Sequence, residues 1–231
     1  MTKKTLTILI LFFTTRFCLA QQNDPLYDLS QKVHFGFSII GTYGKMKFSQ
    51  SPEFFKLDND TLNYVSTKNF PGLGVGGIFN YHITEFWDLR SMVIVQVMSQ
   101  RNLTYHFRGG IEKTALLQST YFELPVLLKY KSVRRKNFRF YAIAGLGYRY
   151  NFTNDVDTER STTKPIVALK PNTFNYDIGV GIDLYYPYFK FSPELKLSND
   201  IFNAIVKDGY IFTNSLNGLY PKLIQFSLHF E

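Results

Sequence analysis

Hydrophobic side chains recur at every second position in eight separate segments of the chain, and this alternation limits the possible folds more than any other feature. A period of two indicates a β-strand with one apolar face, because successive side chains of a strand point to opposite sides. The eight segments are residues 33–43, 72–82, 89–98, 121–130, 139–151, 174–186, 189–197 and 224–230. The pattern predicts an all-β protein built from eight antiparallel strands.

The segment 174–186 shows the alternation most clearly. Ile178 and Val180 fall on one face, whereas Asp177, Gly181 and Asp183 fall on the other. Strands of about ten residues can cross a bilayer when they are tilted, and Tyr or Phe at the ends of most apolar faces is typical of the aromatic girdles of membrane barrels. The sequence therefore favours a transmembrane β-barrel whose apolar face contacts lipid.

A secreted soluble barrel such as a lipocalin has the same number of strands, with the apolar face turned inward. The polar face favours the membrane interpretation, because it is rich in Gly and Ser and carries charges of both signs. In a narrow lumen such charges form a paired network, whereas a water-facing surface needs no pairing. We expect this structural network to comprise Arg90, Glu123, Lys129, Arg139, Arg149, Asp177, Asp183, Lys190, Glu194 and Lys196.

The links between the segments alternate in length. Short links lie at 84–87, 131–137 and 187–188, and long links lie at 44–70, 102–118, 153–171 and 199–219. Outer-membrane barrels have short periplasmic turns and long extracellular loops. We therefore expect a barrel domain over residues 33–231 in the outer membrane, with both of its ends at the periplasm.

The first twenty residues resemble a secretory signal peptide. Lys3 and Lys4 precede an apolar stretch, and Cys18 to Ala20 form a small-residue cleavage site. We expect residues 1–20 to be cleaved and residues 21–32 to form a short periplasmic segment. The alternative, a lipoprotein acylated at Cys18, is disfavoured by the large residues Arg16 and Phe17 before it. One cysteine excludes an internal disulfide, and no basic run with interleaved aromatics suggests nucleic acid.

Several segments resemble a known family of barrels. Residues 119–132 (STYFELPVLLKYKS) are similar to a strand shared by many outer-membrane barrels of the Bacteroidetes lineage. Residues 138–141 (FRFY) with Gly145, residues 176–183 (YDIGVGID), residues 188–196 (YFKFSPELK) and the ending 226–231 (FSLHFE) resemble, more narrowly, the PorT (SprT) family. The resemblance covers the last five predicted strands. It does not extend to the first and third long loops.

The resemblance implies an accessory outer-membrane component of type IX protein secretion, and of gliding motility in gliding species. It implies contact with outer-membrane lipid and with other secretion components, including the large translocon barrel, and it implies neither catalysis nor a cofactor. An eight-stranded barrel is filled by its own side chains and cannot pass a folded protein. A general small porin or structural barrel is the main alternative, and a lipid-modifying enzyme is a further one.

Two sets of residues are candidates for a catalytic or a metal-binding site. Ser38 and His34 share one face of a strand but lie about 13 Å apart, too far for proton transfer. His34, His82 and His229 are expected at the periplasmic rim, pointing inward on neighbouring strands, where three imidazoles can bind a metal or titrate together. The simpler interpretation is that they bond to rim groups such as Glu85 and Glu231, and no metal site is expected.

Overall fold

The structure is a computed structural model that describes residues 32–50, 62–69, 71–107, 112–152, 170–203 and 216–231. The expected signal peptide at 1–20 and the expected periplasmic segment at 21–32, apart from Lys32, lie outside these residues and stay predictions. Within the described ranges, no helix is long and apolar enough to cross a membrane.

The described residues form nine β-strands. Eight of them contain the eight segments expected from the sequence, to within one residue at each end. The ninth, β2, is additional. The strands are β1 Val33–Gln50, β2 Leu62–Asn69, β3 Pro71–His82, β4 Trp87–Phe107, β5 Glu112–Lys131, β6 Phe138–Asn151, β7 Asn172–Tyr185, β8 Lys190–Asp200 and β9 Leu216–Phe230.

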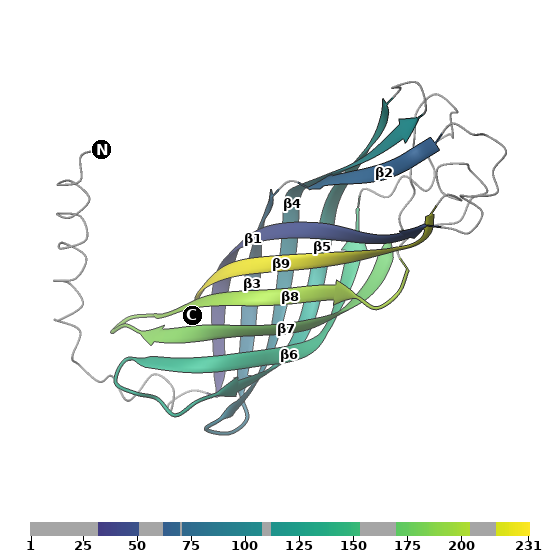
Figure 1. The fold of residues 1–231 in the computed structure, drawn as a ribbon. Helices are drawn as coiled ribbons and strands as arrows, with labels where there is room; N and C mark the ends of the chain where they lie inside the picture. The colour runs from purple at the N-terminus through teal and green to yellow at the C-terminus, as the bar shows by residue number, and fades with distance from the viewer. Residues whose placement is uncertain (1–31, 51–61, 70, 108–111, 153–169, 204–215) are drawn as a thin grey trace, which may run out of the picture.

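The eight long strands close into one antiparallel barrel (Figure 1). Neighbours along the chain pair with each other, and β1 pairs with β9, with Ile39 opposite Leu228. The strand β4 pairs with both β3 and β5, which completes the ring. Because no long strand keeps a free edge, every backbone group in the lipid can find a partner within the sheet. The predicted eight-stranded antiparallel barrel is confirmed.

Several strands continue past the ends predicted from the sequence. The strands β4 and β5 are 21 and 20 residues long, and they stay paired as far as His106 and Glu112. The predicted loop at 102–118 is therefore wrong for most of its length, and the loop at 44–70 was also predicted too long, because it contains the end of β1 and all of β2. Apolar and polar side chains stop alternating where the lipid stops, whereas backbone pairing continues into water.

Figure 1 shows β2 and the ends of β4 and β5 projecting from one end of the barrel, which we call the long-loop end. The strand β2 pairs with the projecting part of β4, from Leu62 opposite Phe107 to Asn69 opposite Arg101. The opposite end, where the turns 83–86, 132–137 and 186–189 lie, is called the short-turn end. The barrel is therefore compact at one end and extended at the other by the three-stranded sheet of β2, β4 and β5.

Alternate side chains of each long strand face outward and inward. On β7, Ile178 and Val180 are 55% and 59% exposed, whereas Asp177 and Asp183 are buried. The outward face of the other strands is likewise apolar, as Phe35, Val75, Val93, Phe140, Leu195 and Phe226 illustrate. The polar face is inside, which is the reverse of a lipocalin.

The lumen also contains a block of apolar side chains, which consists of Ile40, Ile78, Met92, Ile94, Leu127, Tyr141 and Ile143. In the sequence, Met92 and Ile94 only blur the alternation of their segment, because both faces of the strand are apolar there. Along β4 this block lies between the inward residues Arg90 and Gln96. The polar side chains gather toward the two ends of the lumen, but along β8 the inward residues from Lys190 to Asp200 are polar throughout and connect the two groups.

Candidate functional site: the filled lumen

The lumen holds all ten charged residues of the network expected from the sequence. They lie on β4 to β8, and each is 6% exposed or less. Four further buried charges were missed, namely Asp88, Lys131, Asp200 and Glu231. Asp88, Lys131 and Glu231 each lie one alternation step beyond an expected inward residue, and Asp200 lies two steps beyond Lys196, so extending the period of two finds all four. The described interior holds seven cations and seven carboxylates, and this balance matters because an unpaired buried ion costs several kcal/mol.

Arg90 is the centre of the cluster nearer the short-turn end. Its guanidinium donates from Nη1 to Glu194 Oε2 at 2.9 Å and from Nη2 to Glu231 Oε1 at 3.0 Å. Lys190 forms an ion pair with Glu231 at 2.7 Å, and the Tyr141 hydroxyl donates to Glu194 at 2.9 Å. These contacts join β4, β6, β8 and the end of β9 across the lumen.

Lys129 belongs to the same cluster. Its Nζ lies 2.8 and 2.7 Å from the two carboxylate oxygens of Asp183, which also accepts a hydrogen bond from the Ser192 hydroxyl at 2.7 Å. Arg139 lies opposite Asp183 in the register of β6 and β7. Lys129 pairs with Asp183 and does not pair with Glu123, although the two residues share β5.

The second cluster lies nearer the long-loop end. Lys196 Nζ lies 3.0 Å from an oxygen of Asp177 and 3.4 Å from one of Glu123. Arg149 forms an ion pair with Asp200 at 2.6 Å and lies 3.8 Å from Glu123. Because these side chains come from β5, β6, β7 and β8, the cluster ties four consecutive strands together.

Glu231 follows β9 and turns its side chain into the lumen. Burial opposes ionisation of this carboxyl, but Lys190 and Arg90 hold its pKa well below the usual range. Gly36 on the neighbouring β1 leaves the room that Glu231 occupies, since a Cβ at position 36 would collide with the Phe230 carbonyl and lie 2.7 Å from Glu231 Cγ. A larger residue at 36 would displace Glu231 from its cations.

A serine, a histidine and a carboxylate also meet in the lumen. The hydroxyl of Ser38 lies 2.7 Å from Nδ1 of His229, and Nε2 of His229 lies 3.4 Å from Glu194. From the sequence, Ser38 could be compared only with His34 on the same strand. In the structure its histidine neighbour is His229 on β9, 191 residues away. The three groups are the types a nucleophilic site uses, but each is 2% exposed or less, so substrate has no direct access to them.

The three histidines expected at the rim do not converge. His34 lies opposite Asn80, whereas His229 lies opposite Ser38, four residues further along β1, which is about 13 Å at the rise of a strand. His82 pairs instead with Asp88 at 2.9 Å. In the part of the chain that the structure describes, no group of three or more His, Cys, Asp or Glu could hold a metal ion.

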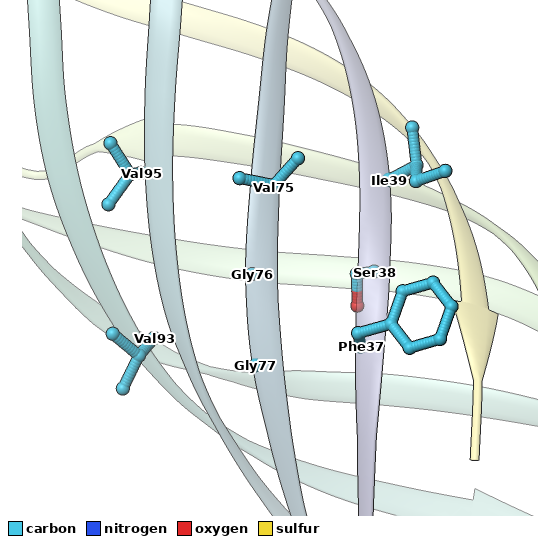
Figure 2. Close-up of a pocket in the computed structure, with 8 residues that line it drawn as sticks. All are labelled: Phe37, Ser38, Ile39, Val75, Gly76, Gly77, Val93 and Val95. Atoms are coloured by element: carbon cyan, nitrogen blue, oxygen red, sulfur yellow. The ribbon is translucent and has the colours of Figure 1, made fainter.

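An open hollow of about 400 Å³ lies on the outer surface over β1, β3 and β4 (Figure 2). Gly77 lies opposite both Phe37 and Val93 in the strand register, and a Cβ added to it would meet nothing within 4 Å. The hollow exists because this outward position has no side chain. Its lining is almost entirely apolar, and it lies on the face that contacts lipid.

The closed barrel, its apolar outer face and its filled polar lumen define the class of outer-membrane β-barrels. Residues 19–205 match the family model described as the outer membrane protein beta-barrel domain. The chain belongs to this family and is located in the outer membrane. In barrels of this class the short turns face the periplasm and the long loops face outward, so the short-turn end described above is periplasmic.

Solved structures similar to this chain include OprG and NspA. OprG of Pseudomonas aeruginosa is 12% identical, with 86% of this chain and 90% of that chain covered and a TM-score of 0.42. Neisserial surface protein A is 9% identical, with 86% and 98% covered and a TM-score of 0.42. Ail of Yersinia pestis is 12% identical, with 87% and 98% covered and a TM-score of 0.37. No curated protein matches the sequence.

Proposed function

We propose that this protein is an accessory outer-membrane component of the type IX protein secretion machinery, and of gliding motility in gliding species. It acts by protein–protein contact and not by catalysis. The observation that carries the proposal is that the segments resembling the PorT family supply half of the fourteen buried charges of the described lumen. They contain Arg139, Asp177, Asp183, Lys190, Glu194, Lys196 and Glu231.

The filled lumen supports action by contact. Arg90, Glu123 and Lys129 have no exposed surface, so side chains fill the lumen at their level. A barrel packed in this way does not conduct an exported protein. It also offers substrate no route to Ser38 and His229, which weighs against the alternative of a lipid-modifying enzyme.

The resembling residues face mostly the lumen or the lipid in turn, so partner contacts fall to other surfaces. The projecting sheet of β2, β4 and β5 and the turns of the periplasmic end are the candidate contact surfaces for other secretion components, including the large translocon barrel. Tyr64 of β2 is 53% exposed, and its ring stacks on His106 at 4.1 Å. Exposed aromatic side chains of this kind are enriched at protein–protein interfaces.

The test is deletion of the gene in the native host, followed by measurement of proteins that carry a type IX C-terminal signal in medium and periplasm. The proposal predicts that these proteins accumulate in the periplasm and that the wild-type gene restores export. Unchanged export refutes it. A change in lipid modification would support the enzyme alternative, and altered uptake of small solutes would support the porin alternative.

A further inference from the structure

Two neighbouring turns at the periplasmic end differ sharply in chemistry. The turn 132–137 between β5 and β6 contains three consecutive cations, Arg134, Arg135 and Lys136, and no acidic residue. The turn 186–189 between β7 and β8 has the sequence Tyr-Pro-Tyr-Phe. The backbone of Tyr185 donates to the Asn137 carbonyl at 2.9 Å, so the two turns lie side by side.

The three cations are held on a tight and well-bonded turn. Arg135 and Phe138 exchange backbone hydrogen bonds of 3.0 and 3.2 Å, and Lys136 has a positive φ of 55°. The guanidinium of Arg134 lies over the ring of Tyr185 at 4.0 Å, and its Nε donates to the Lys136 carbonyl at 2.8 Å. Arg134 is therefore fixed in place by Tyr185 at the end of β7 and by its own turn, whereas Arg135 and Lys136 are exposed.

Exposed aromatic and apolar side chains lie on the same two turns as these cations. Tyr188 is 93% exposed and Val133 is 66% exposed. Tyr186 stacks on Phe189 with ring centroids 5.0 Å apart, and Phe189 lies 6.4 Å from Phe230 on the outward face of β9. The aromatic side chains of the turn thus continue the outward aromatic face of the barrel. In membrane proteins, Tyr and Trp at such an edge lie at the level of the lipid headgroups.

The charge of the turn is not neutralised from within the barrel. The buried charges of the described lumen are already balanced, seven against seven. Among the described residues of the periplasmic end, the exposed Lys, Arg, Asp and Glu residues are Lys32, Glu85, Arg135 and Lys136. Glu85 lies on the neighbouring turn between β3 and β4, where the Lys131 N–H donates to the Phe86 carbonyl at 2.7 Å. One exposed carboxylate does not balance three cations, so the turn 132–137 keeps positive charge for an anion from outside the described residues.

We propose that the turn 132–137 binds the phosphate groups of anionic phospholipids in the periplasmic leaflet of the outer membrane. The aromatic turn 186–189 continues the outward face of the barrel and so places the cations at the depth of the lipid headgroups. For this reason we favour a lipid over an acidic protein as the partner. Arg135 and Lys136 are exposed and attract the anionic surface. Arg134, whose Nη2 is buried and whose Nε is bonded to the Lys136 carbonyl, holds the turn in shape and adds its charge. The proposal does not depend on a role in secretion.

Trp87 is the single tryptophan of the chain and reports on this region. It begins β4, next to the β5 strand that leads into the turn, and its ring lies 4.8 Å from that of Tyr130. The barrel is refolded into phosphatidylcholine vesicles that contain a small fraction of brominated phosphatidylglycerol or brominated phosphatidylcholine. Quenching of Trp87 fluorescence then gives the relative affinity of the two lipids for this surface.

We expect the wild type to prefer the anionic lipid, and we expect Arg135→Gln to lower the preference by about threefold to fivefold. Lys32→Gln is the matched control, because it removes one exposed cation at the same end, and it should change the preference by less than half as much. Arg134→Lys keeps the charge and should still weaken the preference, since the planar guanidinium is lost.

Two results overturn the proposal. Equal quenching by both lipids in the wild type shows that the turn has no lipid preference. If Arg135→Gln also loses protein export, the turn binds an acidic protein partner instead. Equal effects of Arg135→Gln and Lys32→Gln show that the attraction is general and does not belong to this turn. Melting temperatures of all variants confirm that the compared barrels are folded.

Discussion

Lys129→Met removes the cation that pairs with Asp183 inside the lumen. At 2.7 Å and an effective dielectric constant of about 20, the attraction between the two charges is about 6 kcal/mol. Burying both ions costs a comparable amount, several kcal/mol for each. The ion pair therefore contributes about as much to the free energy of unfolding as an apolar pair would. A single unpaired ion keeps its burial cost without the compensating attraction.

We expect Lys129→Met to lower the free energy of unfolding by about 3 kcal/mol, the lower end of the usual cost of breaking a buried pair. The lower end applies because Lys190 and Arg90 also act electrostatically on Asp183. The double variant Lys129→Met with Asp183→Leu should recover most of the loss. Leu128→Met, on the adjacent outward position, is the matched control and should change stability by less than about 1 kcal/mol.

The assay is urea unfolding of the barrel refolded in lipid vesicles, followed by Trp87 fluorescence. The reasoning is refuted if Lys129→Met costs less than about 1 kcal/mol. It is also refuted if the double variant loses as much as the two single variants together, because the coupling between the two charges would then be absent.

Three further predictions address the outer face, the closure and the histidines. Val180→Arg places a charge in the lipid and should cost about 2 to 4 kcal/mol near the midplane, whereas Gly181→Arg should fail by collision with Tyr141 in the lumen; folding yield in lipid checks both, and wild-type yield for Val180→Arg contradicts the orientation. Deletion of residues 225–231 exposes the edges of β1 and β8 to lipid and should abolish membrane insertion; wild-type amounts in the outer membrane would argue against this closure. In a zinc titration of the refolded barrel, we expect the wild type and His34→Ala to behave alike. Zinc binding that is present in the wild type and lost in His34→Ala would indicate a shared histidine site.

The alternation of side chains was sufficient to predict the strands and their two faces. The direction that each face points followed from the Gly, Ser and oppositely charged residues of the polar face. Residues such as Val180 and Asp183 follow the period of two because lipid and lumen lie on opposite sides of one strand. The ends of the strands were not predictable in the same way. Beyond the lipid, β4 and β5 stay paired through backbone hydrogen bonds, which leave no pattern in the hydrophobicity.

The contacts within the lumen depend on information that the alternation does not contain. The meeting of Ser38 with His229 requires the register between β1 and β9. The pairing of Lys129 with Asp183 requires both the tilt of the strands and the width of the barrel. The sequence predicts that these groups point inward, but the choice of partners follows only after the barrel has closed.

The most direct test of the central claim is the amount of type IX cargo exported by the deletion strain when it carries the Ser38→Ala barrel. This substitution removes the hydroxyl bonded to His229 and leaves every outward and loop residue unchanged. If the protein acts by contact, export returns to the wild-type level once equal amounts of barrel in the outer membrane are confirmed. A Ser38→Ala barrel that is present at the wild-type amount and fails to restore export would contradict the account.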